Sequence, residues 1–221
     1  MDPSAKLKLM NLSKESEKLL LKFIPQQSLP LIKKWLEDYP VQVAIVDERK
    51  TKAGDYRPAM SQRIPKITIN VDRNAYRFLI TLTHEIAHHI AFSTFGPYIK
   101  PHGKQWKDTY FSLLSELQHQ HVFPEKLAAT LPTYPARLKS TTAGTAEMDK
   151  ILRAMDHPNE ALTYVEDIAN GTVFFLEDGK SFRKIKKRRV RFLCQNLDNE
   201  KYYLFPPGVQ IYMNPQLVKT I

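Results

Sequence analysis

The chain contains 221 residues, of which 43% are hydrophobic and 25% are charged. This length and composition suit one globular domain of ordinary size, or one domain with a small appendage, and exclude wholesale disorder. No apolar run approaches the ~18 residues of a membrane span, the charged N-terminal residues do not resemble a secretory signal, and the single cysteine, Cys194, excludes an internal disulfide. We therefore expect a cytoplasmic protein without a membrane partner, whose net charge of +10 permits anionic partners without establishing them.

Two helices and two strands are predicted in the first 70 residues, at 13–23, 28–39, 41–47 and 66–70. Pro30 is compatible with the first turn of the second helix, and Pro40 ends it. The two strand segments, VQVAIVD and KITIN, are rich in β-branched residues. The polar segment between them, 48–65, leaves room for one irregular strand.

The segment 73–94 gives the clearest helix prediction, because apolar residues recur there at helical spacing. Gly96 and Pro97 are expected to end this helix. After a loop, a further helix is predicted at 103–118, with Trp106 and three leucines on one side.

The chain changes character after residue 123. Prolines and a Ser/Thr/Gly/Ala run favour a linker over 124–160 that holds a short helix. Five short strands are predicted beyond it, at 172–176, 181–185, 190–194, 202–205 and 209–213. Strands so closely spaced suggest a small sheet or barrel, and Asp178-Gly179 is a typical hairpin turn.

The chemically informative motif is His84-Glu85-Ile86-Ala87-His88, a His-Glu-x-x-His sequence on the predicted helix 73–94. Four residues turn a helix by ~400°, so the two histidines share a face and lie ~6 Å apart along the axis. Imidazoles so placed can converge on one Zn²⁺. Glu85 is rotated by ~100° from His84, so it can reach a metal-bound water without itself being a ligand, as a general base must. Chance alone gives this motif in roughly one chain in a hundred of this composition.

A catalytic zinc also needs a third protein ligand and one open position. His102 and Glu116 are the two candidates. We favour His102, because Pro97 and Pro101 fold the chain back and Gly103 allows the backbone to pass close to the metal. Glu116 lies beside an apolar stripe, where acidic residues usually face solvent.

The sequences HEIAHH and PHGKQW together resemble the SprT-like (Spartan-like) zinc metallopeptidase family, over about residues 30–117. That family has HExxH on a helix, a third histidine after a turn, and a glycine and an aromatic residue close behind. The matching residues here are His84, Glu85, His88, His102, Gly103 and Trp106. The resemblance implies one zinc ion held by the three histidines, Glu85 as the catalytic residue, and Gly103 and Trp106 as supports of the site.

The resemblance further implies a protein substrate and a role at DNA, such as the repair of DNA–protein crosslinks. Glu85 would take a proton from the attacking water and return it to the leaving amine. Tyr98, Tyr110 and His89 remain open as groups that assist the oxyanion, and His89 is expected to support the site rather than to bind metal. Many family members carry a four-cysteine zinc ribbon, but this chain has only Cys194, so no second zinc is expected.

The segment RKIKKRRVR, residues 183–191, contains seven basic side chains in nine positions. They are Arg183, Lys184, Lys186, Lys187, Arg188, Arg189 and Arg191. The segment is either a nucleic-acid contact or a solvated sheet edge that uses basic residues to prevent aggregation. Tyr202 and Tyr203 are candidates for stacking on bases or for packing in the core.

These observations predict an α+β protein in three parts. Residues 1–123 form a minimal zincin-type metalloprotease domain with the HExxH helix packed on a small sheet, 124–160 a linker, and 161–221 a small basic β-rich domain. The leading hypothesis is zinc-dependent peptide-bond hydrolysis directed to nucleic-acid-associated proteins. Two alternatives are a non-enzymatic nucleic-acid-binding protein on a zincin scaffold and a metal hydrolase acting on a non-peptide amide.

Overall fold

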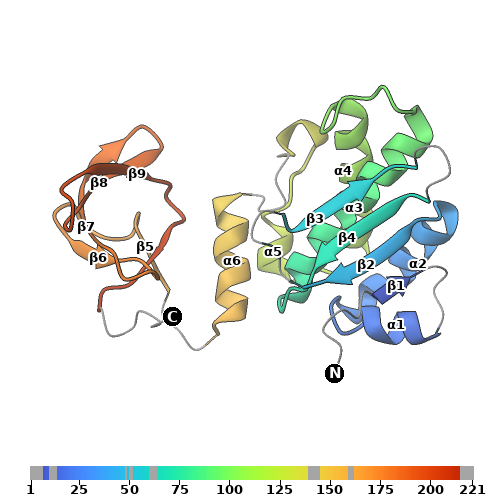
Figure 1. Ribbon diagram of the computed structural model, residues 1–221, viewed down its shortest axis with the longest axis horizontal. Coiled ribbons are helices and arrows are strands. Elements are labelled where there is room, and N and C mark those ends of the chain that lie inside the picture. The colour runs from blue at the N-terminus through green and yellow to red at the C-terminus, as the bar shows by residue number, and fades with distance from the viewer. Residues whose placement is uncertain are drawn as a thin grey trace. The chain divides into compact units, whose positions relative to one another are not determined.

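The computed structural model describes residues 7–9, 14–47, 49, 52–59, 64–138, 145–158 and 162–214. It confirms a mixed α+β fold, with 41% helix and 22% strand. The chain forms two compact units, Met1–Met148 and Asp149–Ile221 (Figure 1). Within the described residues, no helix is both long enough and apolar enough to cross a membrane.

The first unit is built on a four-stranded sheet with the strand order β1-β2-β4-β3. The strands are β1 (Leu7–Leu9), β2 (Gln42–Val46), β3 (Gly54–Arg57) and β4 (Lys66–Asn70). The predicted strands at 41–47 and 66–70 are β2 and β4, which pair in parallel, while β1 and β3 are antiparallel to their neighbours. The polar segment 48–65 contains the edge strand β3, whereas β1 was not predicted.

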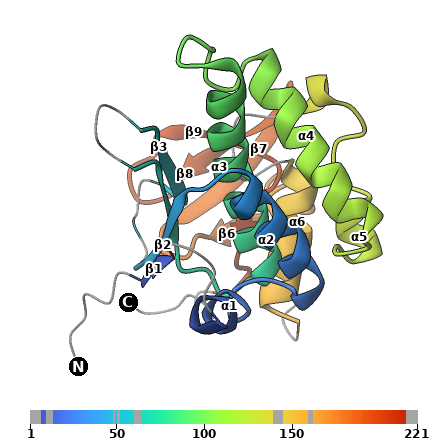
Figure 2. The same ribbon diagram turned by 90° about the vertical axis from the view of Figure 1, so that its right-hand side faces the viewer.

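The helices of the first unit are α1 (Lys14–Leu20), α2 (Leu29–Asp38), α3 (Ala75–Phe95), α4 (Lys104–His119) and α5 (Glu125–Ala128). Short 3₁₀ turns occur at Gln26–Ser28 and Pro135–Arg137. The helices predicted at 28–39, 73–94 and 103–118 are confirmed as α2, α3 and α4. Figure 2 shows these three helices on one side of the sheet, with α3 between the sheet and α4.

Helix α3 has clear start and stop signals. The Asn74 side chain accepts hydrogen bonds from the backbone N–H groups of Tyr76 and Arg77, at 3.1 and 3.0 Å, and so caps the N-terminus. Gly96 follows the last residue with φ +81°, which glycine adopts without strain. The helix is buried on nearly all sides because the sheet covers one face and α4 the other. This packing fixes the motif 84–88 in the interior of the unit.

Part of the predicted linker belongs to the first unit. Leu127, Leu131 and Leu138 are buried, although they lie in the segment expected to be a linker. The helix α6 (Ala146–Asp156) matches the short helix expected there, and the boundary between the units falls within it.

The second unit is an antiparallel sheet in the order β6-β7-β8-β9, with a separate strand pair β5–β10. The strands are β5 (Thr163–Tyr164), β6 (Val173–Phe175), β7 (Ser181–Arg188), β8 (Arg191–Asn196), β9 (Tyr202–Phe205) and β10 (Gln210–Ile211). Five of them match the five predicted strands. Their core consists of Val165, Phe174, Phe182, Phe192, Cys194 and Ile211. Cys194 is therefore a core residue.

Candidate metal centre

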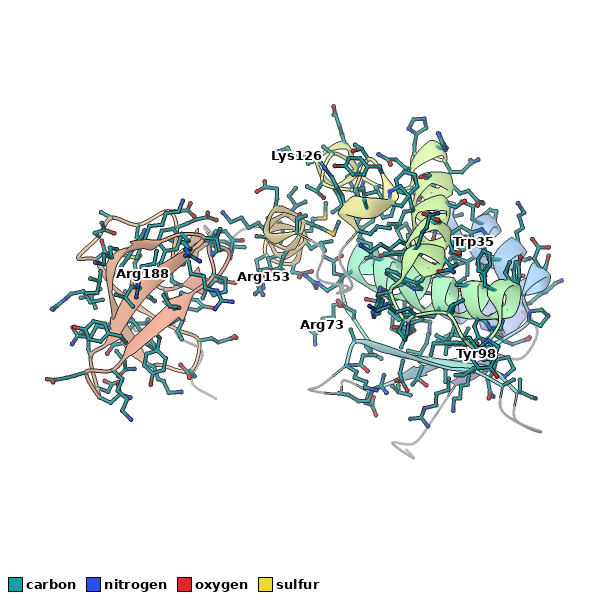
Figure 3. All side chains as sticks on the ribbon, turned by 90° about the horizontal axis from the view of Figure 1, so that it is seen from above. Trp35, Arg73, Tyr98, Lys126, Arg153 and Arg188 are labelled. Carbon is teal, nitrogen blue, oxygen red and sulfur yellow. The ribbon has the colours of Figure 1, made fainter. Side chains whose placement is uncertain are left out.

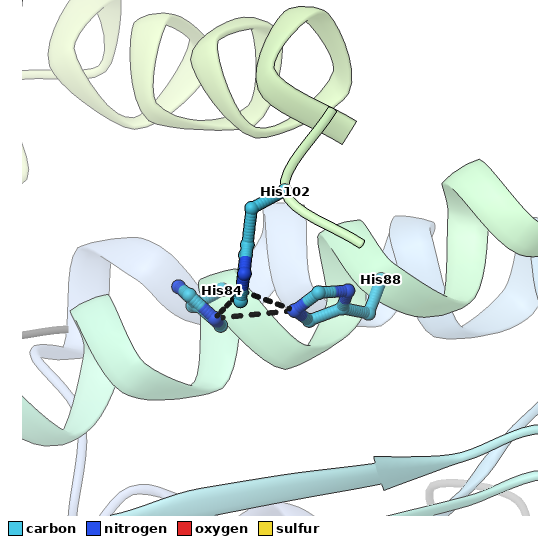
Figure 4. A group of neighbouring side chains, drawn as sticks. All are labelled: His84, His88 and His102. Atoms are coloured by element: carbon cyan, nitrogen blue, oxygen red, sulfur yellow. Dashed lines mark hydrogen bonds between the residues drawn. The ribbon is translucent and has the colours of Figure 1, made fainter. Parts of the chain in front are cut away.

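Three histidines from two elements converge on one point (Figure 4). His84 and His88 lie one turn apart on α3, and His102 lies in the turn before α4. The Nε2 atoms are separated by 3.2 Å between His84 and His88, 3.0 Å between His88 and His102, and 3.3 Å between His102 and His84. Nitrogen ligands at ~2.0–2.1 Å from a tetrahedral metal ion lie ~3.3 Å from one another. The triangle of Nε2 atoms could therefore hold such an ion.

Hydrogen bonds among the three imidazole rings do not explain why their Nε2 atoms face one another. A neutral imidazole presents at each ring nitrogen either one proton or one lone pair, so three mutually facing Nε2 atoms cannot all be satisfied by one another. Burial, together with repulsion from the neighbouring histidines, lowers the pKa of His84 to about 3 and that of His88 to about 4. Burial also lowers the pKa of His102. Near pH 7 these rings are neutral, which is the form that binds metals.

The turn that carries His102 is tightly constrained. The N–H of Gly103 donates to the carbonyl of Lys100 at 2.8 Å, and His102 itself adopts φ +55°, which is uncommon for a non-glycine residue. A Cβ on Gly103 would lie 2.8 Å from the Lys100 carbonyl oxygen. The close approach that requires glycine is therefore within the turn. The expectation that Gly103 lets the backbone pass close to the metal stays a prediction.

Trp106 forms the floor of the centre. Its ring is fully buried, and its centroid lies 4.7, 5.1 and 4.6 Å from those of His84, His88 and His102. One aromatic side chain thus packs against all three imidazoles and restricts their rotation. This is the supporting position expected for Trp106.

Glu116, the other candidate ligand, lies elsewhere. Its carboxylate accepts a hydrogen bond from the indole N–H of Trp35 at 3.1 Å. It is not part of the histidine cluster. The hydrogen bond between Glu116 and Trp35 connects α4 to α2. The position of Glu116 beside an apolar stripe in the sequence did not indicate this contact.

Glu85 is buried under the edge strand β3. The backbone N–H of Tyr56 donates to its carboxylate, and Gly54 contacts the same group. Burial, assisted by the nearby Asp55 carboxylate, raises the pKa of Glu85 to about 7, against smaller opposing effects of Lys52, the Tyr56 N–H and Arg49. A carboxyl group with this pKa can both accept and release a proton near neutral pH.

Tyr56 is a site residue that the sequence did not single out. Its hydroxyl lies 3.2 Å from Nδ1 of His89, and its ring is nearly parallel to that of His88 at 6.5 Å between centroids. Burial raises its pKa to about 12, so the hydroxyl keeps its proton. His89 takes this supporting contact and is not a member of the histidine cluster.

The tyrosines suggested for the oxyanion are poorly placed. Tyr98 is 100% exposed, and the buried hydroxyl of Tyr110 lies 3.4 Å from the Ile80 carbonyl oxygen, to which it donates. Neither borders the open cleft of about 480 Å³ that contains the three histidines and Glu85, whereas Tyr56 does.

In the second unit, the side chains of the predicted basic segment, residues 183–191, do not all face outward, because successive residues of a strand alternate between its two faces. Lys184 is only 4% exposed, and its ammonium donates to the backbone carbonyl of Ile168 at 2.6 Å and lies over the Phe192 ring. The prediction of a nucleic-acid contact at Lys184 is therefore wrong, because the side chain points into the unit and its charge is used there.

The other six basic residues, Arg183, Lys186, Lys187, Arg188, Arg189 and Arg191, are exposed. Figure 3 labels Arg188 near the end of β7. A β-bulge between Lys184 and Lys186 changes the alternation, so Arg183 and Lys186 lie on the same outer face of the sheet.

No protein-family model, curated protein or solved structure matches this chain.

Proposed function

We propose that the first unit is a zinc-dependent peptidase of the SprT-like class. The observation that carries this proposal is the convergence of three Nε2 atoms beside a buried, non-ligating Glu85 in one open cleft. A structural metal site needs no such carboxyl group, and structural zinc is usually enclosed by four protein ligands. Three histidines leave one position for a reactant.

Zinc fits the donor set better than harder cations do. Neutral imidazoles suit Zn²⁺, whereas Mg²⁺ and Ca²⁺ prefer oxygen ligands. His84, His88 and His102 would hold the ion. When bound, zinc supplies Lewis-acid activation of water and of the substrate carbonyl.

Glu85 carries the proton transfers in this proposal. As a carboxylate it accepts the proton of the attacking water, and as an acid it donates that proton to the leaving amine. Its pKa of about 7 suits both steps. The backbone N–H of Tyr56 and the close contact with Gly54, both on β3, hold the carboxylate in place.

The edge strand β3 supports a peptide substrate rather than another amide. Among the strands that the structure describes, β3 pairs only with β4, and it borders the same cleft as the histidines. An extended peptide can add to such an edge through main-chain hydrogen bonds.

The test is zinc stoichiometry and casein cleavage by the wild type, Glu85→Gln and Glu116→Gln. We expect one zinc ion in all three proteins and cleavage by the wild type and by Glu116→Gln, the matched substitution outside the cleft. Glu85→Gln should lose at least ~100-fold in rate, the lower range of general-base catalysis. Cleavage that survives Glu85→Gln, or a zinc-loaded wild type that cleaves neither casein nor oligopeptides, would contradict the proposal.

We also propose that the second unit binds single-stranded nucleic acid, which the outer face of β7–β9 favours. The register places Arg183 beside Gln195 and Tyr202 in one row, and Lys186 beside Leu193 and Leu204 in the next. Tyr202 is 60% exposed. Exposed aromatic and basic side chains on one sheet face provide stacking surface and charge neutralisation together.

This second function is tested with the full chain and a fluorescent oligothymidylate. Tyr202→Ala should weaken binding about tenfold, and Arg183→Ser should reduce the salt dependence by about 0.7 in the logarithmic slope. Lys126→Ser, which removes an exposed charge on α5, should change neither. Tighter binding to a duplex of equal length, or equal weakening by Lys126→Ser, would argue against a single-strand surface on this face.

A further inference from the structure

The cleft at the metal centre is lined by apolar residues as well as by the three histidines and Glu85. Five of these apolar residues, Tyr56, Pro58, Phe92, Pro97 and Ile99, are what we call the apolar pocket. Three segments contribute to it: β3 with the residue that follows, the last turns of α3, and the turn after α3. Tyr56, Pro58, Phe92 and Ile99 are each half-buried.

Helix geometry explains why Phe92 belongs to the site. It follows His88 by four residues, so it lies on the same face of α3, one turn beyond the second histidine. Its ring packs edge-on against Tyr56 with centroids 6.3 Å apart. Tyr56 in turn lies parallel to the ring of His88. The apolar pocket is therefore continuous with the metal centre.

The charged side chains that line the cleft, apart from the histidines, are Lys52, Asp55, Glu85 and Lys100. Lys52 and Asp55 form an ion pair at 2.8 Å, and Asp55 pairs also with Arg57 at 3.0 Å. With two lysines and Asp55 along the cleft, charge gives no argument for a basic side chain of the substrate. The partly exposed apolar surface of Tyr56, Phe92 and Ile99 favours an apolar side chain of the substrate, because covering this surface removes apolar area from water.

We propose that the apolar pocket binds a bulky apolar side chain of the substrate, such as leucine, phenylalanine or methionine, within two residues of the scissile bond. This inference rests on the proposed peptidase function. A peptide that extends along β3 would alternate its side chains between two faces. Those directed toward α3 would enter the apolar pocket, and the contact of Tyr56 with His88 keeps that residue close to the bond that is cut.

Binding can be measured without turnover in the zinc-loaded Glu85→Gln protein. Fluorescent peptides identical except for one residue, leucine, phenylalanine, alanine or aspartate, are titrated and followed by anisotropy. We expect leucine or phenylalanine to lower Kd about tenfold to a hundredfold relative to alanine. Phe92→Ala should remove most of this preference, and Val190→Ala, at an exposed apolar position in the second unit, should leave it intact.

Equal affinity for all four peptides, or a preference that survives both Phe92→Ala and Ile99→Ala, would overturn the inference. Cleavage of the same peptides by the wild type tests the proposed function separately. An apolar preference in binding without Glu85-dependent cleavage would support the pocket and contradict the peptidase. Glu85-dependent cleavage without an apolar preference would support the peptidase and contradict the pocket.

Discussion

Gly54 and Glu85 are in such close contact that the strand residue leaves no room for a side chain. A Cβ at position 54 would lie 2.6 Å from Oε1 of Glu85 and 2.8 Å from its Cγ. The neighbouring Tyr56 donates its backbone N–H to the same carboxylate. The edge strand thus defines the position of the proposed general base, which is 31 residues away from Gly54 in the sequence.

Gly54→Ala is therefore expected to impair catalysis more than folding. The added methyl group would displace the Glu85 side chain, and a misplacement of ~1 Å can cost about 100-fold in rate. We expect kcat/KM to fall about tenfold to a hundredfold, with unchanged zinc content and a similar Tm. Arg57→Ala, at the exposed end of the same strand, serves as the control. Unimpaired cleavage by Gly54→Ala would show that Glu85 does not depend on this contact.

Substitutions at His102 and at Glu116 should have different effects on zinc binding. His102→Ala removes one of the three converging Nε2 atoms, so zinc should be lost on dialysis against a mild chelator, as measured by elemental analysis. Glu116→Gln should keep its zinc. Weakening the hydrogen bond from Trp35 should cost Glu116→Gln about 0.5–1.5 kcal/mol of stability in urea unfolding. The reverse pattern of zinc loss would make Glu116 the third ligand.

The buried carboxyl of Glu85 should appear in the pH dependence of stability. Its pKa is about 7 in the folded protein, against an ordinary value of 4.5. Its favourable contribution is thus complete below pH 4.5 and is lost as the pH rises through 7. In a chelator, Glu85→Gln should become progressively more stable than the wild type between pH 4.5 and 7. The difference should grow by at most about 1.4 kcal/mol per pH unit.

Urea unfolding across this pH range measures the difference directly. The histidines are present in both proteins and contribute in the opposite sense. Their lowered pKa values make both proteins less stable as the pH falls below 6.5. Parallel stability curves for the two proteins would contradict a raised pKa at Glu85.

Lys184 and Arg183 provide a matched pair on opposite faces of β7. Lys184→Met should destabilise the second unit by about 1–3 kcal/mol, because the Ile168 carbonyl loses its buried donor. Arg183→Met removes an exposed charge and should change stability by less than ~0.5 kcal/mol. Hydrogen exchange of the second unit, followed by mass spectrometry, checks both. Similar protection in the two variants would argue against an internal role for Lys184.

The motif-bearing helix was predictable because its information is local. Apolar spacing, the stop at Gly96 and the interval between His84 and His88 all lie within about six turns of one helix. His102 was recognisable because it lies in a proline- and glycine-containing turn that closely follows this helix. The coarse α+β class followed in the same way from segment patterns.

The contributions of Gly54, Tyr56 and Lys184 were not predictable from local pattern. Gly54 and Tyr56 lie in a polar segment, and their importance arises from pairing with β4 and contact with α3. The burial of Lys184 depends on strand register, which a run of basic residues does not encode. Sheet partners decide these positions, and a single sequence does not specify them.

The bulge in β7 determines which positive charges face outward. Lys184 pairs with Cys194, but Lys186 pairs with Leu193, so Ile185 is an extra residue in the ladder. In a regular strand Lys186 would share the inner face with Lys184, and Lys187 would replace it outside. Deleting Ile185 would remove the bulge and leave Lys186 outside, because Lys186 would then directly follow Lys184. Regular pairing with Ile185 retained would instead exchange the two sets of side chains, at the same overall charge. Net charge and outward-facing charge are therefore separate properties of this sheet, and the pairing at the bulge determines the second.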